Sequence, residues 1–131
     1  MKELLINLNL KNIMWIIPCI FFLHEMEEWN IYDWYHNTYQ DPSPSTKLSM
    51  RIWLWLISIW GFLVTAISYV IPNEFVSAMV LLFLIVFTSF NGIQHIYWTM
   101  AFHKYAPGVF WSSVGLFCGT ILTYKIMIQY P

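Results

Sequence analysis

Long apolar stretches dominate the hydrophobic pattern of this chain, and short polar or turn-forming segments separate them. A helix needs about 20 mainly apolar residues to cross the hydrocarbon core of a bilayer. Residues 52–71, 75–102 and 109–130 meet that length, and only the last of them contains a charged side chain, Lys125 near its end. The pattern therefore predicts three membrane-spanning helices in this part of the chain.

The apolar stretch nearest the N-terminus is harder to interpret. Residues 13–23 are uninterrupted but too short to span a bilayer alone. The stretch can be lengthened toward the N-terminus, or forward through a segment rich in His and Glu at 24–28. The forward extension gives a helix at 12–32 that ends in aromatic residues of the kind that anchor at membrane interfaces. We therefore expect an all-α, four-transmembrane-helix bundle that forms one membrane domain over residues 1–131.

The connections between these helices are readable from turn-forming residues. A long loop at about 33–50 contains two prolines, which interrupt helices. Pro72 is expected to end the second helix, and Asn73 can cap the third. A turn at 104–108 closes on Gly108, just before the fourth helix begins.

Composition supports a membrane protein and excludes other classes. Charged residues make up 10% of the chain, whereas soluble domains average about 25%. Six Lys and Arg are balanced by seven acids, so a nucleic-acid partner is not expected. The expected surroundings are a lipid bilayer, with the bacterial plasma membrane as the expected location of this multi-pass protein. A chain this small has little room for a large cavity, and a homodimer stays an open alternative.

Polar side chains gather at the end of the first predicted span. Three of the seven acids lie at Glu25, Glu27 and Glu28, directly after His24. On a helix that turns about 100° per residue, His24, Glu27 and Glu28 share one face. Glu25 falls just outside that arc. An ionisable side chain near the bilayer centre costs about 2.5–3.5 kcal/mol, so we expect these side chains to face the bundle interior.

The third predicted helix carries a complementary set. Asn91 and His95 are four residues apart and share a face, and His103 lies near the helix end. With a rise of about 1.5 Å per residue, Asn91 and His95 come to the same half of the membrane as His24. The two polar groups are therefore expected to meet inside the bundle.

This set of side chains predicts a metal centre. His24 and Glu28 can bind one ion from adjacent turns, with Glu27 as a bridging ligand or as a partner of the ligands. His95 would add a ligand from the third helix, oriented by Asn91. Two His and one or two Glu leave an open position for water, as catalytic Zn²⁺ sites do, and Fe or Mn fits the same donors.

Other interpretations of the same residues stay open. His24-Glu25-x-x-Glu28 resembles the H-E-x-x-H pattern of metalloproteases, with Glu25 as the general base. Without a metal, paired carboxylates could act as acid and base on a lipophilic substrate. A b-type haem between His24 and His95 is made unattractive by the adjacent carboxylates. The structural interpretation is a polar network that joins two helices.

Two motifs identify a resemblance to a known family. His24-Glu25-Met26-Glu27-Glu28 reads as H-x-x-E-E, and Tyr105-Ala106-Pro107-Gly108 reads as Y-x-P-G. Together with one further histidine between them, they resemble the HXXEE-domain family of small integral membrane proteins over about residues 13–130. The resemblance implies suspected enzymatic activity. It marks these signature positions: His24, Glu27, Glu28, Tyr105, Pro107 and Gly108.

The resemblance also bears on individual roles. We assign the further histidine to His95 because Asn91 shares its face, and His103 is the rival, with a possible role beside the ligands. Glu25 lies outside the signature. Tyr105 is expected first as part of a turn, and its hydroxyl could reach the site.

The resulting expectation is a metal-dependent membrane enzyme, of hydrolase or oxidoreductase type, that acts on a lipid-like substrate. The candidate catalytic residues are Glu27, Glu25 and Tyr105. The alternative is a non-enzymatic accessory protein or an ion-coupled carrier in which the polar network is structural. A carrier would need a second gate on the opposite side, where the sequence offers only Glu74.

Overall fold

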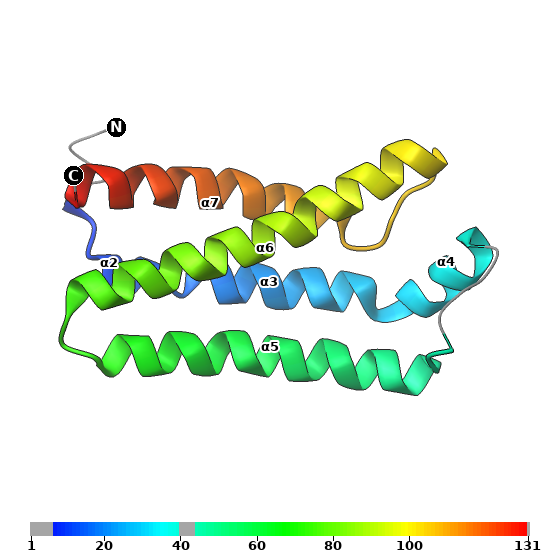
Figure 1. Cartoon of the computed structure of the whole chain (residues 1–131), viewed down its shortest axis with the longest axis horizontal. Helices are drawn as coiled ribbons and strands as arrows, with labels where there is room; N and C mark the ends of the chain where they lie inside the picture. The colour runs from blue at the N-terminus through cyan, green and yellow to red at the C-terminus, as the bar shows by residue number, and fades with distance from the viewer. Residues whose placement is uncertain (1–6, 40–43, 131) are drawn as a thin grey trace.

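The computed structural model describes residues 7–39 and 44–130, and the described residues form α-helices, one 3₁₀ helix and no strands. Figure 1 shows the long helices lying side by side along one axis. This arrangement confirms the predicted all-α bundle. The elements in chain order are α2 (Leu10–Ile13), α3 (Ile16–Glu27), η1 (Glu28–Asn30), α4 (Ile31–Thr38), α5 (Lys47–Val70), α6 (Glu74–Phe102) and α7 (Val109–Gln129).

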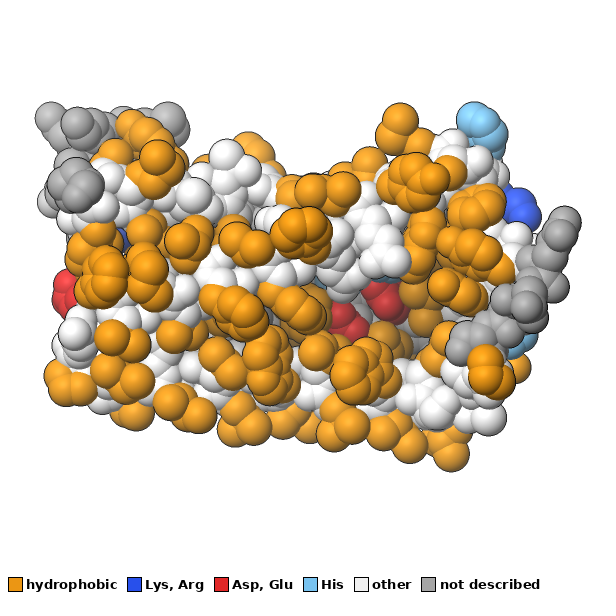
Figure 2. All heavy atoms as spheres, in the orientation of Figure 1, with side chains coloured by type: hydrophobic (Ala, Val, Ile, Leu, Met, Phe, Trp, Pro, Cys, Tyr) orange, Lys and Arg blue, Asp and Glu red, His pale blue; other side chains and the backbone are white. Residues whose placement is uncertain are grey.

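Three of these helices, α5, α6 and α7, are long and apolar enough to cross a membrane. Their outer surfaces are covered by hydrophobic side chains, as the orange spheres of Figure 2 show. Asn73 caps α6 as predicted, because its side-chain oxygen accepts from the amides of Phe75 and Val76. Helix α5 begins earlier than predicted, at a capping box formed by Thr46 and Ser49.

The first predicted span is not one continuous helix. The structure divides residues 12–32 among α2, α3, η1 and the start of α4. Pro18 gives a reason for the break before α3, because its ring clashes with the carbonyl of residue i−4, which is Met14. At its other end the chain tightens into the 3₁₀ helix η1, and α4 then occupies part of the expected loop.

Helix α3 packs against α5, α6 and α7 and is therefore the central element of the bundle (Figure 1). Its entry is held by Lys11 of α2, whose ammonium donates to the carbonyls of Tyr69 and Ile71 at the end of α5. Because α3 packs against three helices, the buried polar side chains of its last turn face neighbouring helices. This position determines which groups can meet His24.

Helices α6 and α7 approach closely at small residues. A Cβ added at Gly92 would lie 3.0 Å from the Ser112 Cβ and 3.3 Å from the Ser112 carbonyl oxygen. A Cβ at Gly119 would lie 3.0 Å from the Ile85 Cγ2. Small residues at such a contact let two backbones approach, as is common in membrane helices. This contact fixes the start of α7 beside the end of α3.

We predict that Gly92→Val destabilises the bundle by about 1–3 kcal/mol, because its side chain would push against the Ser112 backbone. The measurement is the thermal unfolding midpoint in detergent micelles, followed by circular dichroism. Ile93→Val is the control, because Ile93 lies on the exposed side of the same helix. Equal midpoints for the two variants would contradict this account of the α6–α7 contact.

Candidate functional site

The H-x-x-E-E segment lies where α3 changes into η1. His24 and Glu25 belong to the last turn of α3, and Glu28 begins η1. All three side chains are buried, with 3–6% of each residue exposed. A buried carboxylate needs a compensating partner, so its neighbours decide what this segment can do.

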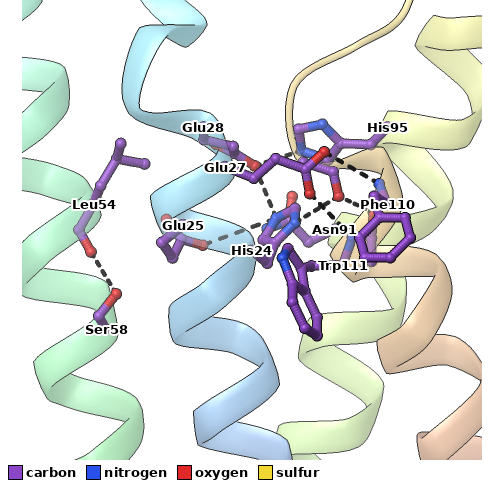
Figure 3. Close-up of polar contacts among 12 residues, drawn as sticks. His24, Glu25, Glu27, Glu28, Leu54, Ser58, Asn91, His95, Phe110 and Trp111 are labelled. Atoms are coloured by element: carbon purple, nitrogen blue, oxygen red, sulfur yellow. Dashed lines mark hydrogen bonds and ion pairs between the residues drawn. The ribbon is translucent and has the colours of Figure 1, made fainter.

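Two histidines converge on one carboxylate oxygen in this site (Figure 3). Glu28 Oε1 lies 2.8 Å from His24 Nε2 and 2.8 Å from His95 Nε2. The two imidazole rings stand almost perpendicular, with an interplanar angle of 86°. The candidate ligand atoms of the three residues all lie within 4.8 Å of one another, so this group could hold a metal ion.

The hydrogen bonds of His24 define which ring nitrogen carries its proton. Nδ1 lies 2.9 Å from the Gly108 carbonyl oxygen, which only accepts, so Nδ1 is the donor. The Asn91 amide nitrogen lies 2.9 Å from Nε2 and donates to it. In the neutral ring, Nε2 therefore carries no proton, and its lone pair accepts from Asn91 while Glu28 Oε1 lies 2.8 Å away.

With His24 neutral in this way, no proton of its ring lies between Nε2 and the Glu28 carboxylate. The buried Oε1 of Glu28 lies 2.8 Å from two ring nitrogens, and each of these contacts is a hydrogen bond only where a proton lies between the two atoms. Two lone-pair atoms at that distance repel each other unless a proton or a cation lies between them. His95 Nδ1 is buried without a hydrogen-bond partner in the described part of the chain. A proton shared between Glu28 and an imidazole satisfies these contacts, and the same group of atoms could also hold a cation.

Gly108 joins the second motif to the first. Its backbone has φ +94°, in the left-handed region that favours glycine. A Cβ at this position would lie 2.6 Å from His24 Cε1 and 2.9 Å from Glu28 Oε1. The same carbonyl that binds His24 also accepts from the amide and hydroxyl of Ser112. The glycine of Y-x-P-G thus lets the turn approach His24 and Glu28 closely, and its carbonyl orients the His24 imidazole.

Glu27 faces away from this group and caps α7. Its carboxylate accepts from the backbone amides of Phe110 and Trp111, at 3.3 and 3.0 Å, and from the Tyr105 hydroxyl. Acidic groups at a helix N-terminus satisfy free amides and complement the helix dipole. Partial burial and the bond to Glu27 raise the pKa of Tyr105 to about 12, so its hydroxyl stays a donor at neutral pH.

Glu25 lies on the side of α3 opposite Glu27, beside a cavity of about 540 Å³. Its Oε1 is 4.0 Å from His24 Nε2 (Figure 3), and its side chain lines the cavity together with Glu28 and Asn91. Residues from three helices, α3, α5 and α6, form the walls. Glu25 and Glu28 therefore both connect the His24 group to this cavity.

The structure thus separates the sequence-predicted site residues into groups. It brings together His24, Glu28 and His95, with Asn91 bonded to His24 and Glu25 beside them. It places His103 at the exposed, left-handed end of α6, outside this group. The predicted ligand and catalytic roles of Glu27 stay predictions, since its oxygens bond to α7 and Tyr105.

Sequence reasoning missed two contributors to the site. The Gly108 carbonyl was expected only as part of a turn, and Ser112, which shares it, was not considered. The spacing of Gly108 and Ser112 as N-cap and fourth residue of α7 was the available signal. That spacing indicates where a helix begins, but it does not indicate that His24 bonds to the Gly108 carbonyl.

We predict that Glu27→Ala lowers the free energy of unfolding by about 1–2 kcal/mol, because the start of α7 loses its cap. Faster hydrogen exchange at the Phe110 and Trp111 amides is the measurement. Tyr105→Phe removes one of the three donors and is expected to cost less. Unchanged exchange in Glu27→Ala would show that the carboxylate does not protect these two amides.

Comparison with known proteins agrees with the two motifs. Residues 15–123 match a family described as "Protein of unknown function with HXXEE motif". Neither the curated proteins nor the solved structures give a match. The matched segment contains every residue of the His24, Glu28 and His95 group and the Gly108 turn that supports it. By this match over most of its length, the chain belongs to the HXXEE family.

Proposed function

We propose that the protein is a metal-dependent membrane enzyme in which His24, Glu28 and His95 bind one divalent cation. The observation that carries the proposal is the convergence of two Nε2 atoms on Glu28 Oε1 in a buried site. A cation between these atoms removes the lone-pair repulsion that the neutral His24 tautomer creates. The Nδ1 bond from His24 to the Gly108 carbonyl is the support that metal-binding histidines commonly have.

The distances are compatible with a small cation after a modest adjustment. In a tetrahedral site with bonds of about 2.0–2.1 Å, ligand atoms lie roughly 3.4 Å apart. The observed separations of 2.8 Å are shorter, so an ion would spread the three side chains by several tenths of an ångström. Two imidazoles and one carboxylate suit Zn²⁺, Fe²⁺ or Mn²⁺.

The chemistry follows from the ion and from Glu25. Such an ion acts as a Lewis acid and lowers the pKa of bound water. Glu25 is buried, faces the cavity and lies 4.0 Å from His24 Nε2. It is placed to accept or return a proton during a reaction in the cavity. These groups support hydrolysis of a lipophilic substrate that reaches the cavity, and with Fe²⁺ they would support its oxidation by O₂.

The competing function is structural, and one observation favours it. A doubly protonated His24 paired with Glu28 would satisfy the same distances without a metal. Such a buried ion pair would join α3 to α6 through His95 and Asn91. The two functions differ in metal content, which is directly measurable.

We predict about one equivalent of Zn, Fe or Mn in protein purified without chelator. Glu28→Gln and His95→Ala are expected to lower that content at least tenfold, since each removes a ligand. Glu27→Gln is the matched control, because Glu27 is a neighbouring acid whose oxygens bond to α7. The structural function would be established instead if the wild-type protein contained no metal and the Glu28→Gln variant were less stable.

We also predict that Gly108→Ala weakens metal binding by about 10–100-fold without replacing a ligand. The added Cβ would displace His24, and the left-handed backbone would be strained. The measurement is competition with a chromophoric chelator, with circular dichroism to verify folding. Gly115→Ala is the control, because its Cβ would make only ordinary contact with Ile20. Equal affinities in the two variants would contradict the role given to Gly108.

A further inference from the structure

The cavity beside Glu25 opens on the lipid-facing side of the bundle. It lies between α3, α5 and α6, and two aromatic residues on its border, Trp53 and Phe90, are 63% and 73% exposed. Figure 2 shows acidic side chains in a hollow of an otherwise hydrophobic surface. A molecule in the bilayer can therefore reach the site sideways, between α5 and α6.

The walls of the cavity combine apolar and polar side chains. Phe21, Leu54 and Phe87 supply apolar surface from three different helices. Glu25 and Glu28 add carboxylates, and the amides of Asn91 and Gln94 add donors and acceptors. The volume of about 540 Å³ is in the range of sites that hold one small molecule. One apolar chain with a polar end matches this distribution.

The charge of the site restricts the polar end. Among the described residues that line the cavity, two are Glu and none is Lys or Arg. With one divalent cation bound, two carboxylates and two neutral imidazoles sum to zero charge. An anionic head would give this neutral site a net negative charge that no lining Lys or Arg balances, and a cationic head would give it a net positive charge. An uncharged head that hydrogen-bonds to Glu25 and Asn91 fits best.

Resting on the proposed metal centre, we propose that the substrate is a single-chain bilayer amphiphile with an uncharged polar head, of the alcohol, ester or amide class. It enters between α5 and α6. The head lies against Glu25, Glu28 and Asn91, and the chain passes Trp53 and Phe90 into the surrounding lipid. The bilayer thus supplies the substrate and the apolar wall selects for its chain.

The experiment uses hexadecyl probes that carry a photoreactive diazirine near the head and differ only in that head: alcohol, carboxylate or trimethylammonium. The full-length protein is placed in phosphatidylcholine nanodiscs, irradiated at neutral pH and analysed by peptide mass spectrometry. We expect the alcohol to label the cavity segments of α5 and α6 about tenfold more than either charged probe. Removing the metal with a chelator should shift the preference to trimethylammonium, since two carboxylates leave the site negatively charged even when His24 is protonated.

A pair of matched variants tests the location. Ile57→Trp fills the cavity and is expected to abolish the preferential labelling. Ile59→Trp places the same side chain on the exposed face of α5 and should leave labelling unchanged. Circular dichroism establishes that both variants fold. Equal labelling of the two would overturn the cavity as the binding place.

The remaining outcomes separate this inference from the metal centre. Preference of the metal-loaded protein for carboxylate or trimethylammonium would overturn the uncharged head. Metal-containing protein without cavity labelling would overturn the lateral substrate site and leave the metal centre standing. Cavity labelling by the alcohol in protein that never contains metal would support the amphiphile site and overturn the proposed metal function.

Discussion

The contact between Glu28 and two imidazoles is the constraint on which the site depends. A carboxylate that is 6% exposed inside an apolar bundle is costly to bury. It is compensated here by His24 and His95, each 2.8 Å away. The rest of the site serves that contact: Gly108 orients His24 through its carbonyl, and Asn91 orients it from α6. Helices α3, α6 and α7 are thereby joined at one point.

The two family motifs act as one structural unit because α7 begins beside the end of α3. Glu27 binds the amides of Phe110 and Trp111, which holds the helix start against the H-x-x-E-E segment. Gly108 can then approach His24 closely because it lacks a Cβ. Neighbouring acids in one motif consequently face different surroundings. Glu27 meets a helix terminus, Glu28 meets two histidines at the edge of the cavity, and Glu25 faces the cavity beside them.

Much of this arrangement was accessible from local sequence rules. Apolar lengths predicted the α6 and α7 helices to within a residue or two, and Asn73 was recognised as a cap. The spacing of four residues placed Glu28 beside His24, and helix depth brought His95 to the same level. Helix geometry, however, fixes only the direction of a side chain around its own axis. It could not tell that the face of Glu27 would meet the N-terminus of α7.

The sequence by itself determined a helical membrane bundle and a concentration of His and Glu in one half of it, because apolar length and residue spacing act locally along the chain. Tertiary structure alone decided the breaks around α3, the three separate surroundings of Glu25, Glu27 and Glu28, and the opening between α5 and α6. These features depend on which helices lie next to α3. Close packing at glycines contributes to that choice, because Gly61 of α5 lies against Phe21 and Gly115 of α7 lies against Ile20, and these residues are far apart in the chain.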